Sequence, residues 1–433
     1  MNLFSTQFTR NAVSLTVWAV TFVFTILSGR GEDKEALPSK PSLTDYIRVG
    51  IANNPGLRSE HEKYQAALQQ IPQAKSLPDP KFSATSFVRD VQTRTGPQRN
   101  QLAVGQTFPW FGKLRLSGEI ASKEAQAIYH LYENSLLVLH RDISVAYYDY
   151  AYLAEATKIT REIISLLERL EPSVQEKVRV GGDLAPLLRL QVEIGKNHDV
   201  LQSLEKDRRR QNATISALLG RRKENLLPWP QLKVGKVSME SRTKFVEAMF
   251  AGNPELKAIE KRIERSQEAV KLSKLSPIPD PMIGVNYLDT GAALNPGTPG
   301  SGDDPWGVQI SFKIPIWFGK YKAEKKQALA NQRVFEKLLT DRQNGLLSEL
   351  ERALEDFREA EERTALYTKT LLPAARQAVE VSEESYKANR STILDVIDSE
   401  RTLLELEKTF WRAVANGYSS RIRLETLVGR RTE

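Results

Sequence analysis

The chain has 433 residues, with 62 Lys and Arg against 54 Asp and Glu, and it contains no cysteine. The absence of cysteine excludes disulfides, thiolate metal sites and a cysteine nucleophile. The formal charge of +8 does not predict a nucleic-acid partner, because the basic clusters are scattered along stretches of helical period and are typical of solvated helix faces.

The first thirty residues have the pattern of a secretory signal. Arg10 precedes an apolar run from Ala12 to Leu27, which is short for a membrane-spanning helix and is interrupted by Ser and Thr. The expected cleavage site lacks the usual pair of small residues, so an uncleaved anchor is the alternative. The sequence therefore predicts a signal peptide at residues 1–30.

The chain contains an internal duplication. Residues 42–76 read as two short helices broken at Asn54-Pro55, and the same break returns at Asn253-Pro254. A Pro-Asp-Pro turn at residues 78–80 returns at residues 279–281. Helix breaks and turns that repeat at a nearly constant offset of about 200 residues indicate two copies of one unit. We expect repeat 1 at residues 42–221, a connector at 222–241 and repeat 2 at 242–430.

Each Pro-Asp-Pro turn is followed by alternation of period two, which predicts two strands in each repeat. In repeat 2 the residues Val308, Ile310 and Phe312 alternate with polar neighbours, and a loop rich in Gly, Pro, Asn and Asp separates them from the preceding strand. A length of about ten residues suits a tilted transmembrane strand. The expected strands are 82–94, 99–109, 282–290 and 306–316.

The second strand of each repeat ends in a doubled motif, at residues 108–113 and again at residues 314–320. Proline ends the strand and a helical period follows, so the motif marks a junction between strand and helix. Its aromatic pairs are placed where a membrane-interface belt lies, and the alternative is ordinary core at a strand end. The proposed joint residues are Trp110, Phe111, Gly112, Trp317, Phe318 and Gly319.

Long helical stretches follow both joints. In repeat 1 one stripe contains Leu139, Ile143 and Tyr150, and in repeat 2 apolar and small residues recur in steps of four and three from Ala353 to Ser385. This is coiled-coil spacing. The expected helices are 113–180 and 184–219 in repeat 1, and 320–388 and 393–428 in repeat 2.

The turns of the two helix hairpins lie at the same distance from the joints. Gly182 is 69 residues after Lys113, and Asn389 is 69 residues after Lys320. Equal lengths predict two tips at one level. The tip residues are Gly181, Gly182 and Asp183 in repeat 1, and Asn389, Arg390, Ser391 and Thr392 in repeat 2.

Two carboxylates follow the second tip. Asp395 and Asp398 are three residues apart and share a helix face, whereas repeat 1 has Leu188 and Gln191 at the corresponding positions. Two interpretations stay open. The acids form a charged entrance, or they complement the dipole at a capped helix start.

The motifs of common enzymes are missing. The four histidines have no metal-ligand spacing, no Gly-x-Ser-x-Gly elbow occurs, and no Gly-Lys pair is followed by Ser or Thr as in a phosphate loop. A turn role is enough to explain Asp79 and Asp280 within their Pro-Asp-Pro turns. The sequence predicts no catalytic site, no metal site and no cofactor.

These repeated marks, together with the run Leu394 to Arg401 after the second tip, resemble the TolC family of outer-membrane efflux proteins over residues 42–430. The resemblance implies a mainly α fold with a membrane β-barrel contribution. In the family a homotrimer gives four strands per chain to a twelve-stranded barrel and its helices to a periplasmic tunnel. Four strands cannot close a barrel alone, which also requires oligomerisation.

The resemblance also implies roles for the tips. Both tips would meet a periplasmic adaptor that joins an inner-membrane pump, and Asp395, Asp398 and Arg390 would line the tunnel entrance. Arg390 is displaced by one position from the basic residue of some members, with Ser391 in its place, and the lipidated cysteine of many members is missing. The form Phe-Pro-Trp-Phe-Gly-Lys is similar to members paired with heavy-metal cation pumps. With four Met and four His in the chain, a drug or a polypeptide substrate stays open.

The expected function is therefore a passive outer-membrane duct of a tripartite efflux or secretion system, in contact with outer-membrane lipid and with no catalysis of its own. The alternative is a periplasmic coiled-coil adaptor or scaffold anchored by its N-terminus. Two equivalent hairpins, each following its own strand pair, favour the duct. A hydrolase is a distant third, since the required residue patterns are missing.

Overall fold

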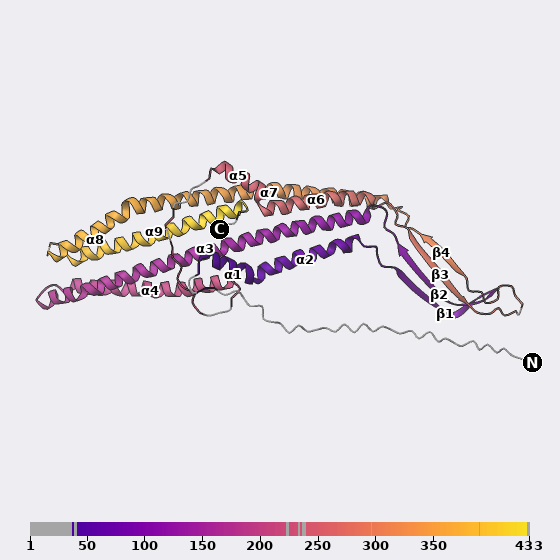
Figure 1. Ribbon diagram of the computed structural model, residues 1–433, viewed down its shortest axis with the longest axis horizontal. Coiled ribbons are helices and arrows are strands. Elements are labelled where there is room, and N and C mark those ends of the chain that lie inside the picture. Colours follow the sequence, from indigo (N-terminus) through magenta and orange to yellow (C-terminus); the bar gives the residue numbers. More distant parts are fainter. Residues whose placement is uncertain are drawn as a thin grey trace, which may run out of the picture.

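The computed structural model describes residues 37–38, 41–221, 225–232, 234–235, 240–295, 297–388 and 390–430. The predicted signal peptide at residues 1–30 and the tip residue Asn389 lie outside this part of the chain. The described molecule is long and narrow. Helices fill most of its length, a four-stranded sheet lies at one end, and two helix hairpins end at the other (Figure 1).

The two repeats have the same order of elements: a helix pair, a strand pair and a helix hairpin. Repeat 1 contains α1 (Leu43–Asn53), α2 (Pro55–Lys75), β1 (Lys81–Thr93), β2 (Gly96–Thr107), α3 (Lys113–Arg179) and α4 (Ala185–Leu218). Repeat 2 contains α5 (Arg242–Gly252), α6 (Pro254–Leu275), β3 (Met282–Thr290), β4 (Trp306–Ser311), α7 (Phe318–Leu366), the π-helix η1 (Tyr367–Leu371), α8 (Leu372–Lys387) and α9 (Ile393–Leu427).

The Asn-Pro breaks join helices end to end. The Asn54 side chain accepts from the Leu57 N–H at the start of α2 and donates to the Leu218 carbonyl at the end of α4, at 3.0 and 2.9 Å. In repeat 2, Asn253 donates to the Leu427 carbonyl at the end of α9 at 3.0 Å. One side-chain amide thus pairs with a backbone N–H at the start of one helix and with a backbone carbonyl at the end of another. Each long helix, α3 or α7, is consequently flanked by two shorter helices that meet near its middle.

The core of repeat 1 follows the predicted stripe of α3. Leu139, Ile143, Ala146 and Tyr150 are all buried and pack against α1 and the end of α4. The Tyr150 hydroxyl donates to the Leu227 carbonyl at 2.7 Å, so the connector is fixed to the same core. The stripe prediction for this helix is confirmed.

The helical segment expected over 320–388 extends from Phe318 to Lys387 and contains a π-turn. A π-turn, η1, interrupts it just before Pro373, which has no N–H and whose ring clashes with a carbonyl four residues earlier in an α-helix. The π-turn contains one extra residue, so the buried stripe moves by one position. Leu372 and Ala375 are buried, whereas Ala374 and Ala378, which continue the expected steps of four and three from Ala353, are exposed.

The four strands form one antiparallel sheet in the order β1-β2-β3-β4. Strand β2 begins three residues before the predicted start, because residues from Gly96 onward already pair with the end of β1. Gly96 takes a φ of 138° beside the Gly291 carbonyl, where a Cβ has no room. Strand β4 ends at Ser311 instead of residue 316. Ser311 pairs with Met282, the first residue of β3, so the residues that follow have no partner strand among the described residues.

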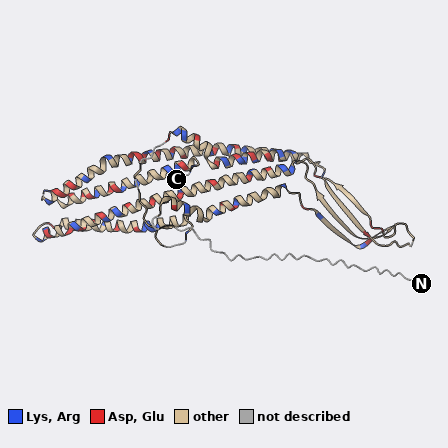
Figure 2. Ribbon diagram, in the orientation of Figure 1, with Lys and Arg blue, Asp and Glu red and all other residues tan. Residues whose placement is uncertain are grey.

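Charge and exposure separate the two ends of the molecule. Acidic and basic side chains are interspersed along the helices, while the strands carry few of them (Figure 2). One face of the sheet exposes apolar side chains, among them Phe82, Val104, Val285 and Ile310. None of the described helices combines the length and hydropathy that a membrane-spanning helix needs.

Candidate functional site

The first tip is a tight turn that requires glycine. Gly181 takes a left-handed φ of 95°, and the Gly182 N–H donates to the Lys177 carbonyl at 2.9 Å. A Cβ on Gly182 would lie 2.6 Å from that same oxygen. Asp183 then accepts from the Ala185 N–H at 3.0 Å, at the start of α4. These bonds close one helix and begin the next within a few residues.

The second tip closes in a similar way. The Arg390 N–H donates to the Ser385 carbonyl at 2.8 Å, five residues back, which is the bond that Gly182 makes in the first tip. The Ser391 hydroxyl reaches the Ser382 carbonyl at 3.4 Å. Arg390 is exposed and its side chain is directed by neither of these bonds, so its charge is available at the tip surface.

Asp395 caps the helix that follows the second tip. Its carboxylate accepts from both the N–H and the hydroxyl of Thr392, each at 2.8 Å. These hydrogen bonds, the backbone one foremost, lower the pKa of Asp395. The structure therefore shows the capped helix start that the sequence left as an alternative, and it also leaves the charged carboxylate exposed.

Asp398 lies about one turn further along α9 and is exposed. It lines a groove of about 410 Å³ between α4 and α9, together with Arg189, Lys196 and Arg401. Asp395 is absent from that lining. The two acids predicted to act together thus have different surroundings: Asp395 is bound to a helix cap, and Asp398 lies in a groove lined by three cations and by Glu193.

A buried carboxylate near the second tip was missed by the sequence analysis. Glu400 is only 6% exposed and lies on the α9 stripe between Val396 and Leu404. Burial, followed by the negative charges of Glu383 and Glu407, raises the pKa of Glu400 to about 7. The signal was present in the sequence, since Glu400 stands four residues from each of two apolar stripe positions.

The first joint is fixed by a turn from the other repeat. The Asp280 carboxylate accepts from the Trp110 N–H at 2.7 Å and from the Lys113 ammonium at 2.8 Å. Lys113 also donates to the Ile278 carbonyl at 2.7 Å. Burial raises the pKa of Asp280, but these two hydrogen bonds outweigh it, so the pKa is lowered. The sequence alone indicated only a turn role for Asp280, and the structure adds a contact that fixes the first joint.

The second joint has the same residues without the same contacts. Lys320 is exposed, with its ammonium 5.7 Å from the centroid of the Tyr321 ring. Asp79, the counterpart of Asp280, is also exposed, and within the described part of the chain it forms no hydrogen bond or ion pair. The aromatic residues of both joints are exposed, with Phe111 at 87% and Trp317 at 74%. Ordinary core at a strand end does not describe them.

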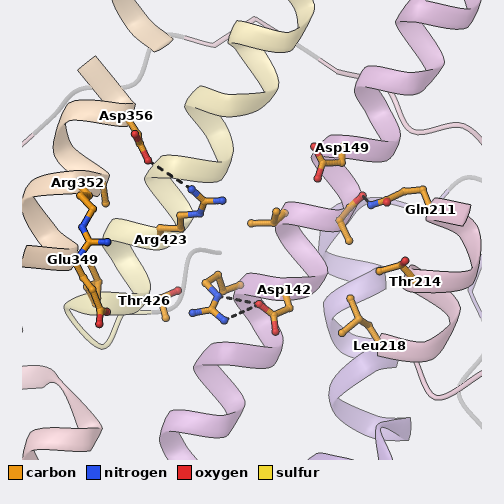
Figure 3. Close-up of a pocket in the computed structure, with 15 residues that line it drawn as sticks. Asp142, Asp149, Gln211, Thr214, Leu218, Glu349, Arg352, Asp356, Arg423 and Thr426 are labelled. Carbon is orange, nitrogen blue, oxygen red and sulfur yellow. Dashed lines mark hydrogen bonds and ion pairs between the residues drawn. The ribbon is translucent and has the colours of Figure 1, made fainter. Parts of the chain in front are cut away.

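A charged cavity of about 720 Å³ lies between the two hairpins (Figure 3). Arg423 of α9 pairs with Asp356 of α7 at 3.7 Å, and Asp149 of α3 accepts from Arg412 of α9 at 2.8 Å. These side chains are about half exposed, so each pair contributes at most about 1 kcal/mol. Pairing across three helices is suited to holding the hairpins in register.

The described residues contain no group of three or more His, Asp and Glu side chains that could hold a metal ion. Of the four histidines, His130 lies 2.8 Å from Glu133 and His198 lies 3.4 Å from Glu168, in isolated pairs on the helices. The features that stand out are accordingly the tips, the joints and the apolar sheet face.

Comparison with known proteins places these features in context. A family model described as outer membrane efflux protein matches residues 246–430, which is most of repeat 2. Among curated proteins, Nodulation protein T of Rhizobium leguminosarum bv. trifolii is 21% identical over 393 residues, covering 86% of this chain and 82% of that protein.

Solved structures share the fold over nearly the whole chain. The outer-membrane channel OprN has a TM-score of 0.76 and 17% identity, covering 92% of this chain and 93% of its own. The outer membrane protein VceC of Vibrio cholerae has a TM-score of 0.74 and 17% identity, with 90% and 97% covered. CusC has a TM-score of 0.74 and 16% identity, with 90% and 92% covered.

Proposed function

We propose that this chain, whose residues 246–430 belong to the outer membrane efflux protein family and whose fold is that of the solved channels, is the outer-membrane duct of a tripartite efflux or secretion system. It conducts substrates passively from an inner-membrane pump across the periplasm and the outer membrane. It performs no catalysis of its own.

The observation that carries this proposal is the separation of two ends of the molecule by long helices. The sheet at one end exposes apolar side chains on one face, and two charged hairpin tips lie at the opposite end (Figures 1 and 2). An exposed apolar face of this kind fits lipid. The open edges β1 and β4 require further copies of the chain, so a homotrimer with twelve strands is the proposed assembly.

The tips are proposed to bind the periplasmic adaptor. Both turns are short, hydrogen bonded and exposed, and Val180 and Leu184 beside the first turn present apolar surface to a partner helix. The proposed adaptor-binding residues are Gly181, Gly182, Asp183, Asn389, Arg390, Ser391 and Thr392.

The tunnel entrance is proposed to be lined by Asp395, Asp398 and Arg390. Asp395 and Asp398 both expose a carboxylate on the helix that follows the second tip, which supports an entrance that favours cations. Gating would follow from a change in packing between the hairpins, biased by adaptor contact. The aromatic residues of the joints would lie at the inner membrane interface.

The duct and the scaffold are distinguished by fractionation. A duct remains with the outer membrane as a detergent-soluble trimer and forms ion-conducting pores in planar bilayers. A periplasmic scaffold is released from membranes once the segment before residue 37 is removed, and it conducts no current. Release as a monomer would overturn the proposed function.

The entrance is tested by block of the open pore with a polyvalent cation such as hexaamminecobalt. Replacing Asp395 and Asp398 by alanine should weaken the block. A matched gain of charge at the corresponding positions of repeat 1, Leu188→Asp with Gln191→Asp, should strengthen it. If block is the same in all three proteins, these residues do not line the entrance.

A further inference from the structure

We propose that a second copy of this chain completes the second joint: Asp79 of one copy accepts from Lys320 and the Trp317 N–H of its neighbour, next to strands β1 and β4 paired in one defined register. The inference rests on the proposed homotrimer and assigns its contacts residue by residue.

The two strand hairpins define which residues of the repeats correspond. Within repeat 1, Lys81 pairs with Gly105, and within repeat 2, Met282 pairs with Ser311. Aligning the Pro-Asp-Pro turns equates Lys81 with Met282, and aligning the prolines that follow the strands equates Gly105 with Ser311. Both hairpins therefore have the same register, which fixes β1 as the counterpart of β3 and β2 as the counterpart of β4.

The contact between repeats inside the chain supplies the register between copies. Strands β2 and β3 pair with Gly105 opposite Gly284. The counterparts of these residues are Ser311 in β4 and Ser83 in β1, and β1 and β4 are the two open edges of the sheet. If the same contact is repeated between copies, Ser311 of one chain lies opposite Ser83 of the next. Ile310 then lies opposite Ala84.

The joint repeats in the same manner. Asp280 binds Lys113 and the Trp110 N–H within the chain, and the counterparts of these three residues are Asp79, Lys320 and Trp317. One backbone bond is common to both joints, since Lys113 and Lys320 each donate their N–H at 3.0 Å to the carbonyl of the tryptophan three residues back. The second joint therefore has the same donor residues, with Lys320 exposed, and its acceptor comes from the neighbouring copy.

Exposure on the second repeat agrees with a missing neighbour. Phe312, Ile314 and Ile316, which follow the end of β4, are each about 60–70% exposed and alternate as in a strand. On α7, Val334 is 59% exposed, whereas its counterpart Ala127 on α3 is fully buried. In repeat 1 the other half of the chain packs on this side, through contacts of α3 with α6. The equivalent cover for α7 is helix α2 of the next copy.

Cysteine pairs test the register directly, because the chain has no native cysteine. In outer membranes treated with copper phenanthroline, the pairs Ser83→Cys with Ser311→Cys and Ala84→Cys with Ile310→Cys should give disulfide-linked trimers on non-reducing gels. Within one chain, β1 and β4 are separated by three strand spacings, roughly 14 Å, which is too far for a disulfide. Of two neighbouring pairs in an antiparallel ladder, one is hydrogen bonded and the other is not, so the test includes both geometries.

The matched controls exchange the partners of these pairs. Ser83→Cys with Ile310→Cys and Ala84→Cys with Ser311→Cys are each one residue out of register, so the two thiols point to opposite faces of the sheet. These variants contain the same four substitutions and should give at most a small fraction of the linked product. Equal linking in all four variants would overturn the proposed register.

Charge reversal tests the joint. Asp79→Lys and Lys320→Asp should each lower by several degrees the temperature at which the trimer dissociates in detergent, and the double variant should recover most of the loss. Lys322→Asp, an equal change of charge on an exposed lysine of the same turn, should have no effect that Asp79→Lys restores. Absence of recovery in the double variant would overturn the pairing of Asp79 with Lys320.

Failure of this inference is distinguishable from failure of the proposed function. Chemical cross-linking of the unaltered protein reports on the trimer alone. A trimer in which neither in-register pair links would overturn the inference and leave the duct standing. A monomer that is released from membranes would overturn both.

Discussion

The two strand-to-helix joints share the residues Trp-Phe-Gly-Lys and differ in structure. Gly112 takes a left-handed φ of 89° and precedes α3, whereas Gly319 lies inside the first turn of α7. Lys113 is 15% exposed and bound by Asp280, while Lys320 is exposed. The same local sequence thus has two conformations, and the difference follows the presence of the aspartate. Asp280 of repeat 2 binds the joint of repeat 1. Within the described residues, no carboxylate binds Lys320 at the joint of repeat 2.

The largest expected effect compares two glutamates at corresponding positions. Glu193 pairs with Lys196 at 3.4 Å, and Glu400 is buried with Leu403 in place of that lysine. Because the pKa of Glu400 is raised to about 7, the folded protein holds the proton more tightly, and stability falls as pH rises from about 4.5 to 7. Glu400→Gln should remove this loss and stabilise the protein at pH 8 by roughly 3 kcal/mol, with little change at pH 4.

Thermal unfolding followed by far-UV circular dichroism at pH 4 and pH 8 measures this effect. Glu193→Gln is the matched control, since it removes an ion pair whose lysine is 64% exposed to solvent and should change stability by less than about 1 kcal/mol at either pH. A pH-independent effect of Glu400→Gln would show that the carboxyl is not the titrating group.

The second prediction compares the joint glycines. Gly112→Ala should destabilise the protein by about 1–2 kcal/mol, because a side chain disfavours the left-handed backbone. Gly319→Ala should stabilise α7 by roughly 0.5–1 kcal/mol, because alanine is favoured inside a helix and nothing lies within 4 Å of the added methyl. Opposite changes in the thermal unfolding temperature of the two variants would show that the two joints have different backbone conformations. Destabilisation by both would mean that the assembled second joint adopts the conformation of the first.

The third prediction compares the turn aspartates. Asp280→Ala should cost about 1 kcal/mol, since its hydrogen bonds to Lys113 and Trp110 are charged but partly screened by solvent. In hydrogen-exchange mass spectrometry, peptides covering residues 108–116 should exchange faster. Asp79→Ala should leave these peptides unchanged and act only on residues 314–322. Faster exchange at both joints in either variant would contradict the assignment of one aspartate to each joint.

The smallest expected effect is at the second tip. Asp395→Asn keeps the hydrogen-bonding shape but removes the charge that accepts from Thr392, so the first turn of α9 should exchange modestly faster. Asp398→Asn is the matched control, because no side-chain hydrogen bond holds its carboxylate among the described residues. Equal exchange in the two variants would show that Asp395 does not cap the helix.

Much of the fold follows from the sequence because its signals are local. The Asn-Pro breaks, the alternating strands and the α3 stripe each depend on neighbouring residues, and the structure places helices and strands within a few residues of the expected positions. The end of β4 at Ser311 depends instead on where its partner β3 begins. A residue pattern alone does not give the length of a paired strand.

The candidate site was only partly predictable for a related reason. The tips were found because glycine and capping residues mark turns. The contact of Lys113 with Asp280 spans 167 residues, and the amide of Asn54 reaches 164 residues to Leu218, so no local pattern reports them. Glu400 was visible as a charge on an apolar stripe, but its burial depends on the helices that cover it.

The π-turn at Tyr367–Leu371 has a consequence for tolerance to changes in chain length. A π-turn accommodates one residue more than an α-helical turn while the helices on either side keep their facing. Removing Thr368 should therefore convert α7, η1 and α8 into one continuous α-helix, with Leu372 and Ala375 still buried. Removing a residue within α8 should instead rotate every side chain beyond it. At the π-turn of the second hairpin, one residue can thus be deleted while the same side chains of α8 stay buried.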